Sequence, residues 1–320
     1  MGPANGRQVC QPARVMRNRM TERDSMLLSQ VMADLPVEII RDVSVRRFGP
    51  LSIASEGLIQ YYSDPRFARQ LEALCGVRAI IASPDLGPMV PDDFGLAVCD
   101  SPKEMFLKAY LRYGAALEVP EPFPNRIDAS ARIHPRAAIA EHSVCIGANV
   151  SISANAVIHE RVTIEDDASI GANSVLGGDG FEVGIVDGRQ IVVPHYGSVL
   201  IRRGAVIMTN CSIDWGLFGG CTEIGEGSVV DNLVHIAHNV RVGRNCQIIA
   251  CAMIGGSTVI EDRARVGPNA TVSNALRIGC DARVTLGAVV TRDVEPGGHV
   301  TGNFALPHSQ FIENMRKARP

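Results

Sequence analysis

Aliphatic side chains recur at every sixth position through the central and C-terminal parts of the chain. The longest run has twelve consecutive members: Ile224, Val230, Ile236, Val242, Ile248, Ile254, Ile260, Val266, Val272, Ile278, Val284 and Val290. An earlier run has six: Ile146, Ile152, Ile158, Ile164, Ile170 and Leu176. Shorter runs with the same spacing of six begin at Ile127 and Ile201. A repeat this short and regular predicts a solenoid of stacked coils.

The spacing within each hexad suggests how a coil closes. A small or β-branched residue precedes most of the aliphatic positions by two, as Val234, Cys246 and Ala264 do. A strand of about four residues would point both side chains inward, and a turn of about 120° would let three hexads close a triangular coil. Glycine often follows the aliphatic residue directly, where we expect it to supply the turn conformation. The 24 hexads predict a parallel β-helix of about eight coils.

The hexad register breaks at 177–198 and at 214–223. The inserted residues must loop out of the coil, and loops on a rigid framework often carry function. The alternative is a β-helix that serves only as a rigid spacer.

The rest of the chain lacks the repeat. Residues 37–117 alternate strand-like and helix-like stretches, which predicts a small α/β domain. A proline-rich linker at 118–126 then leads into the β-helix at 127–303. We expect residues 1–36 to be a disordered leader and 304–320 a short tail with one brief helix.

Composition narrows the possible partners. The net charge of −3 and the isoelectric point near 6.2 do not favour binding to nucleic acid. No apolar run is long enough for a membrane-spanning helix, so integral membrane association is not expected. The nine cysteines include no CxxC pair and suit a reducing cytoplasm.

The segment DNLVHIAHNV (231–240) holds the densest polar cluster of the repeat region. Ile236 takes the inward position, so His235, His238 and Asn239 lie at a corner and on the outer face. Acylation of an amine needs a base, and histidine suits this role because its pKa is near neutral. His238 is the candidate base. The alternatives are solvated surface histidines, or zinc ligands shared between subunits.

This segment, followed by MIGGST (253–258), resembles the UDP-3-O-acylglucosamine N-acyltransferase family of lipid A biosynthesis, within the hexapeptide-repeat acyltransferases. The resemblance spans about residues 40–303 and includes GGDGF (177–181), VPHYG (193–197) and SIDWG (212–216). In the small domain, IQYYSDPRF (59–67) is similar to the family segment that holds uracil.

The resemblance implies a left-handed β-helix that forms a homotrimer with active sites between subunits. It implies that His238 is the general base and that Asp231, Asn232 and His235 line the amino-sugar site. Acyl carrier protein or coenzyme A would carry the acyl group as a thioester, and no metal or other cofactor would be needed.

The same resemblance implies that Tyr61 and Phe67 sandwich uracil, since aromatic rings stack well on bases. Asp64 stands where the family usually has an asparagine that contacts uracil. Gly256 is a candidate to offer its backbone N–H to the developing oxyanion. Purely structural roles are the alternative for these residues. Tyr61 and Phe67 could be aromatic residues of the core, and Gly256 could be a turn glycine.

The sequence departs from the family at three places. Ala275 stands in place of a second active-site histidine, and Trp215 stands in place of an arginine. Val289 lies in the stretch where the family has a methionine that limits acyl-chain length. Three alternatives to the family activity stay open. The chain could acylate another nucleotide-linked amino sugar from a short acyl-coenzyme A, it could bind nucleotide sugars without catalysis, or it could be a zinc-dependent hydratase.

Overall fold

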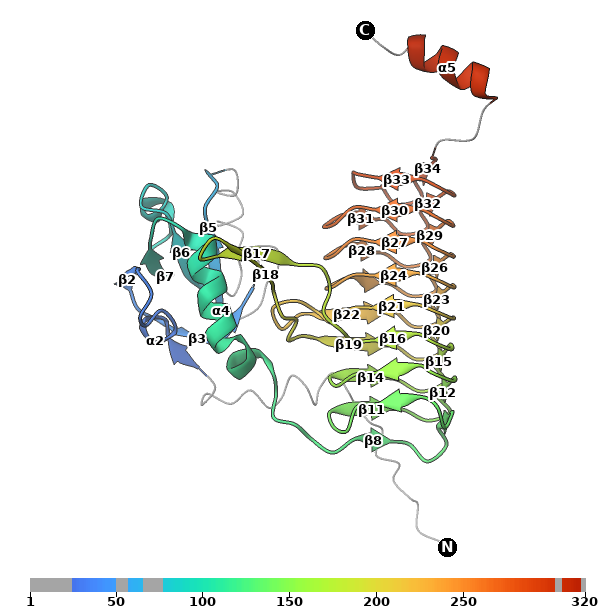
Figure 1. Cartoon of the computed structure of the whole chain (residues 1–320), viewed down its shortest axis with the longest axis horizontal. Helices are drawn as coiled ribbons and strands as arrows, with labels where there is room; N and C mark the ends of the chain where they lie inside the picture. The colour runs from blue at the N-terminus through green and yellow to red at the C-terminus, as the bar shows by residue number, and fades with distance from the viewer. Residues whose placement is uncertain (1–24, 50–56, 66–76, 303–306, 318–320) are drawn as a thin grey trace, which may run out of the picture.

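The computed structural model describes residues 25–49, 57–65, 77–302 and 307–317. A column of stacked coils lies beside a smaller domain, and the two are joined near the middle of the column by the segment around strands β17 and β18 (Figure 1). No helix in the described part of the chain is both long and apolar enough to cross a membrane.

Three parallel sheets form the walls of the column. One consists of β10 (Ala138–Ile139), β13 (Val157–Ile158), β16 (Val175–Leu176), β21 (Ser212–Ile213), β24 (His235–Ile236), β27 (Met253–Ile254), β30 (Thr271–Val272) and β33 (Val289–Val290). The second consists of β8 (Arg126–Ile127), β11 (Val144–Ile146), β14 (Val162–Ile164), β19 (Ser198–Ile201), β22 (Cys221–Ile224), β25 (Arg241–Val242), β28 (Val259–Ile260) and β31 (Arg277–Ile278). The third consists of β9 (Arg132–Ile133), β12 (Ser151–Ile152), β15 (Ser169–Ile170), β20 (Val206–Ile207), β23 (Val229–Val230), β26 (Gln247–Ile248), β29 (Arg265–Val266), β32 (Arg283–Val284) and β34 (His299–Val300).

These sheets contain eight, eight and nine strands, so the predicted β-helix of about eight coils is confirmed. Each strand pairs with the strand one coil further on, as Ile236 does with Ile254. The aliphatic positions of the hexads therefore stack above one another inside the column, where Ile236, Ile254 and Val272 are completely buried. Strands of two residues are stable here because neighbouring coils together bury one continuous core.

The corners of the coil differ from the prediction. The backbone takes a left-handed conformation three residues after the aliphatic position, often at asparagine, with φ of 59° at Asn239 and 53° at Asn245. The glycine that follows the aliphatic residue directly has another role. A β-carbon at Gly243 would lie 2.7 Å from the backbone nitrogen of Asp262 in the next coil. These glycines allow neighbouring coils to approach closely.

The small domain is an α/β unit built on a five-stranded sheet. The strand order is β2 (Glu38–Arg41), β7 (Gly95–Val98), β6 (Val77–Ala82), β5 (Leu58–Tyr62) and β4 (Arg47–Phe48). The remaining elements are β1 (Met26–Leu27), α2 (Leu28–Val31), β3 (Ser44–Val45), η3 (Gly87–Met89) and the long helix α4 (Pro102–Glu118).

The small domain begins earlier than the sequence suggested. Strand β1 pairs with β3, and Leu28, Val31 and Met32 are buried in the same core as α4. Residues 25–36 are therefore part of this domain, and the expectation of a disordered leader up to residue 36 is wrong for them. Residues 1–24 lie outside the described residues.

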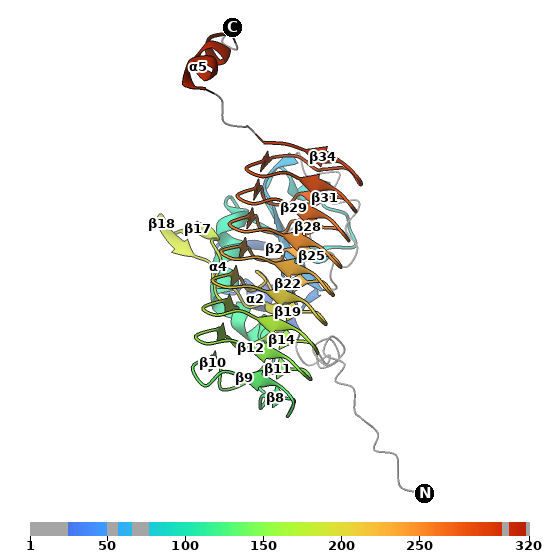
Figure 2. The same cartoon turned by 90° about the vertical axis from the view of Figure 1, so that its right-hand side faces the viewer.

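The two register breaks leave the coil and contact the small domain. The first contains the hairpin of β17 (Val183–Val186) and β18 (Arg189–Val192), which projects sideways from the column in Figure 2. Lys108 of α4 forms an ion pair with Asp187 at the hairpin turn, at 2.7 Å. The second break contributes Phe218, whose ring packs against Phe106 and Tyr110 of α4.

The tail contains a helix, α5 (His308–Lys317), which lies beyond the last coil in Figures 1 and 2. It matches the brief helix expected within 304–320.

Candidate functional site

A cavity of about 540 Å³ lies where the small domain meets the column. The column lines it with residues of three successive coils, among them His235, His238, Gly256 and Ala275. The small domain adds Tyr61, Lys103, Phe106 and Leu107, and the two inserted segments add Phe181, Glu182, Leu217 and Phe218. Polar groups thus converge on a pocket with aromatic walls, as in many ligand sites.

His238 follows β24, at the corner where Asn239 turns the chain into the next strand. Its ring lies against Gly256 of the next coil, where a β-carbon would come within 2.5 Å of both Cε1 and Nε2. A glycine at position 256 therefore makes room for the imidazole. His238 Nδ1 is buried and has no hydrogen-bond partner among the residues that the structure describes. This leaves Nε2 as the ring nitrogen on the side of the cavity.

His235 is held by a carboxylate. Its Nε2 lies 2.9 Å from Oδ2 of Asp214, which is almost completely buried. This hydrogen bond raises the pKa of His235, because the negative charge favours the protonated ring. Asp214 follows β21, directly below β24 in the same sheet, so the pairing of adjacent coils brings the two residues together.

A further histidine, His195, lies next to His238. The two ring centroids are 5.4 Å apart. His195 belongs to the first inserted segment and is only 1% exposed. Its Nδ1 lies 3.0 Å from the carbonyl oxygen of Val193. Burial lowers the pKa of both His195 and His238, so both rings are biased towards the neutral form.

Tyr61 is the one predicted uracil contact that the structure places at this cavity. It is half-buried, and its ring centroid lies 5.2 Å from that of Phe106. Asp64 does not line the cavity, and its charge acts on Tyr62 instead. Phe67 lies outside the described residues, so the uracil sandwich stays a prediction.

Asp231 and Asn232 lie one corner away from the cavity, between β23 and β24. Asp231 accepts hydrogen bonds from the backbone nitrogens of Asn232 and Ala250, and Asn232 accepts one from Thr209. In a single chain these side chains tie neighbouring coils together. Their predicted contact with the amino sugar stays a prediction, as does the oxyanion role of Gly256.

Sequence reasoning missed His195, Asp214, Lys103 and Phe106 as parts of the site. A signal existed for the first two, because both lie in the segments where the hexad register breaks. Trp215, which departs from the family pattern, does not line the cavity. It is buried in the core of the column, and its Nε1 donates to the carbonyl oxygen of Glu160.

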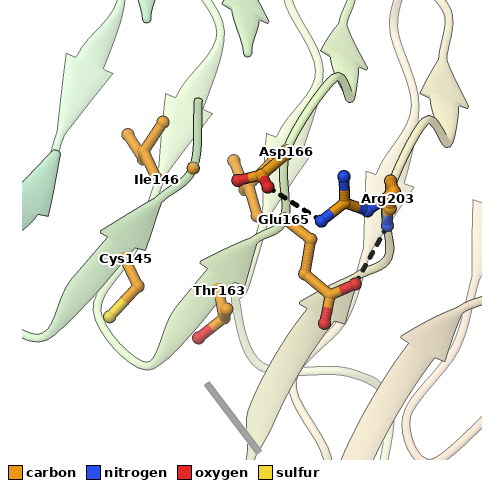
Figure 3. A pocket seen from close by; sticks show the side chains of 8 residues that line it. Cys145, Ile146, Thr163, Glu165, Asp166 and Arg203 are labelled. Carbon is orange, nitrogen blue, oxygen red and sulfur yellow. Dashed lines mark hydrogen bonds and ion pairs between the residues drawn. The ribbon is translucent and has the colours of Figure 1, made fainter. Parts of the chain in front are cut away.

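A second hollow of about 120 Å³ lies on the second sheet of the column and is lined in part by Cys145, Thr163 and Arg203 (Figure 3). Arg203 donates to Asp166 at 2.9 Å and, through its backbone nitrogen, to Glu165 at 3.0 Å. The charged side chains of this hollow are thus already bonded to one another. We therefore assign the candidate site to the larger cavity, which His235 and His238 line. Within the described residues, no three His, Cys, Asp or Glu side chains are grouped so that they could hold a metal ion.

The fold and its repeat define the class of protein. The family described as "Bacterial transferase hexapeptide (six repeats)" matches residues 146–178. This match agrees with the hexad repeat, and the left-handed parallel β-helix predicted for the column is confirmed.

The more specific resemblance to the UDP-3-O-acylglucosamine N-acyltransferases is also confirmed. The protein of that name from Caulobacter sp. (strain K31) is 40% identical over 157 residues, which cover 49% of this chain and 44% of the relative. The one from Bordetella pertussis is 29% identical over 89% of this chain and 85% of its own length. The alignment with the Caulobacter protein thus spans less than half of that relative, and so does the alignment with the protein of the same name from Methylobacterium nodulans, which is 38% identical over 161 residues and is covered to 44% of its length.

Solved structures of another acyltransferase are similar in part. The UDP-N-acetylglucosamine acyltransferase of Bacteroides fragilis is 21% identical with a TM-score of 0.43, over 61% of this chain and 78% of that one. The enzyme of the same name from Francisella novicida is 25% identical with a TM-score of 0.37, over 59% and 73%.

Proposed function

We propose that this protein transfers an acyl group from a thioester to the amine of a UDP-linked amino sugar similar to UDP-3-O-acylglucosamine. The proposal rests above all on the position of His238, whose pKa is lowered by burial and which lies in the same cavity as the aromatic Tyr61. The names of its relatives support this substrate class.

In the proposed reaction, the sugar amine attacks the thioester carbonyl carbon and forms the C–N bond. His238 Nε2 takes the proton that the amine loses, and the C–S bond then breaks. The departing thiolate receives that proton and leaves as a thiol. A base with a lowered pKa is available in its neutral form near pH 7, as the first step requires.

The small domain would hold the nucleotide. Tyr61 offers a ring face to the uracil base. Lys103 is the only lysine or arginine among the described residues that line the cavity, and its ammonium group suits the diphosphate. The nucleotide and the amine would then occupy opposite ends of one cavity.

The proposal also covers the oligomeric state of the protein and the thioester that donates the acyl group. A homotrimer, with a mass near three times 34.3 kDa, would bring Asp231 and Asn232 of one subunit to the site of another. No metal or organic cofactor takes part in the transfer as written. Sedimentation would test the trimer, and a comparison of acyl carrier protein with coenzyme A thioesters would identify the donor.

The decisive experiment measures N-acylation of UDP-3-O-acylglucosamine by wild type and His238→Ala. We expect turnover to fall roughly 10²- to 10⁴-fold. His299→Ala, in the exposed last strand of the column, serves as the matched control and should retain full activity. Unchanged turnover in His238→Ala would refute the role of the base.

Nucleotide binding is tested separately by calorimetry with UDP-sugars and dTDP-sugars. Tyr61→Ala should weaken UDP-sugar binding by about 1–3 kcal/mol, whereas Tyr61→Phe retains the ring and should bind as wild type does. Equal affinity for all three proteins would contradict the proposed uracil contact. Tight binding without any acyl transfer would favour a non-catalytic protein.

A further inference from the structure

Two histidine rings, those of His195 and His238, lie close together at the cavity, with their centroids 5.4 Å apart. Nδ1 of His238 and Nε2 of His195 are both buried, and neither has a hydrogen-bond partner among the residues that the structure describes. Leaving a buried polar atom unpaired costs about 1–3 kcal/mol. Two such atoms in adjacent rings would remove both costs by bonding to each other.

The proton positions can be assigned from the surroundings of His195. Its Nδ1 lies 3.0 Å from the carbonyl oxygen of Val193, which can only accept a hydrogen bond. Nδ1 must therefore carry the proton. In the neutral ring, Nε2 of His195 is then a hydrogen-bond acceptor without a donor.

His238 requires the opposite arrangement on its buried side. A base that accepts a proton at Nε2 must carry its own hydrogen on Nδ1. That N–H needs an acceptor, and it needs one even more once the ring becomes positively charged. His195, whose ring centroid lies 5.4 Å from that of His238, offers an unused acceptor, whereas Oδ2 of Asp214 already binds His235.

The distance between the rings fits such a bond. A ring nitrogen lies about 1.1 Å from an imidazole centroid, and an N–H···N bond is about 3.0 Å long, so bonded rings have centroids about 5.2 Å apart. The observed separation is 5.4 Å, with the ring planes 66° apart. At this separation the rings are close enough for such a bond once the two nitrogens face each other.

The backbone around His195 is held firmly. Arg161 is buried, and it donates from Nε to the carbonyl oxygen of Gly197 at 2.9 Å and from Nη2 to that of His195 at 3.3 Å. Its guanidinium lies 4.3 Å from the ring centroid of Trp215. The tryptophan that departs from the family pattern therefore contacts the arginine that fixes the loop of His195.

We propose that His195 is the positioning residue of the base: its Nε2 accepts a hydrogen bond from Nδ1–H of His238, which leaves Nε2 of His238 free to take a proton from the amine. This inference rests on the proposed function for its catalytic consequence. It also gives this chain a second histidine at the site although position 275 is an alanine. His195 itself is buried and acts only through His238.

Other charged groups surround the pair. Asp179 lies 3.6 Å from Nδ1 of His195, and Asp214 and His235 act on the pKa of His238. A change of pH profile would therefore not identify the contact by itself. The tautomer of His238 identifies the contact, because it shows which ring nitrogen carries the hydrogen.

The test is ¹⁵N NMR of the histidine rings in the full-length protein, with the signals of His238 assigned by their loss in His238→Asn. We expect the Nδ1–H tautomer in wild type, with a coupling across the hydrogen bond between the two ring nitrogens. His195→Leu should give a mixture of tautomers, and His195→Gln, which retains an acceptor oxygen, should restore the wild-type form. His134→Leu, on an exposed turn of the first coil, is the control.

Kinetics supply the second measurement. His195→Leu should lower kcat roughly 10- to 100-fold with KM nearly unchanged, and His195→Gln should recover most of it. An Nε2–H tautomer in wild type, or the same tautomer in wild type and His195→Leu, would overturn the proposal. If wild type transfers no acyl group, the proposed function fails, while the tautomer measurement still decides the contact.

Discussion

Phe218 provides a quantitative test of how the small domain is attached to the column. The side chain is 9% exposed, and its ring centroid lies 4.8 Å from that of Tyr110 and 5.3 Å from that of Phe106. Truncating a buried phenylalanine to alanine costs about 3–5 kcal/mol, to which each aromatic pair contributes about 0.5–1.5 kcal/mol. We expect Phe218→Ala to weaken this contact by about 4 kcal/mol.

The assay is hydrogen exchange, which measures local stability along the chain. A loss of about 4 kcal/mol accelerates exchange roughly 10³-fold for amides that exchange through undocking. The effect should concentrate in helix α4, which packs on Phe218, and should spare β26 to β33, where the coils are held by their own core. Because the cavity lies at this contact, KM for the nucleotide sugar should rise as well.

Phe181→Ala is the matched control. Phe181 also lines the cavity but is 85% exposed, so its loss should change stability by less than about 0.5 kcal/mol. Equal exchange in α4 for the two variants, or equal acceleration in α4 and in the column for Phe218→Ala, would contradict the role of Phe218 in attaching the small domain.

Three further changes test the energetics. Burial raises the pKa of Glu118 to about 7, so the stability that this group contributes is full below about pH 4.5 and is lost as pH rises through 7. In thermal melts, Glu118→Gln should therefore be more stable than wild type by up to about 3 kcal/mol at pH 8, and by little at pH 5. Gly243→Ala should destabilise the column by about 1–3 kcal/mol in urea unfolding, because the new β-carbon would clash with Asp262 of the next coil. Asp214→Asn should lower the pKa of His235 in an NMR titration, and it should destabilise the protein more at pH 6 than at pH 9, since the charged pair exists only below the raised pKa.

For each of these three variants, one result would contradict the prediction. A Glu118→Gln variant that gains equally at pH 5 and pH 8 would show that ionisation is not the cause. A loss under about 1 kcal/mol for Gly243→Ala would mean that the coils can separate to admit a methyl group. An unchanged pKa of His235 in Asp214→Asn would remove the carboxylate as its main influence.

The β-helix could be predicted from the sequence because its rule is local. Each hexad places one aliphatic residue inward, and the stacking of equivalent positions, such as Ile236 on Ile254, follows from the period itself. His238 could be found for the same reason, since its distance from Ile236 fixes its place at a corner. The turns were harder, because only the contacts between coils show that Gly243 is needed for close approach and not for its own conformation.

The composition of the site was decided by tertiary structure. His195 and Phe218 lie in segments that leave the repeat, and the period does not specify where such a segment goes. Their positions depend on contacts with α4 and on the buried bonds of Arg161, which join parts of the chain that are far apart in sequence. The sequence by itself therefore determined the column and the candidate base. Only the packing of the inserted loops and the small domain against the column decided which residues surround that base, because those contacts are long-range and follow no period.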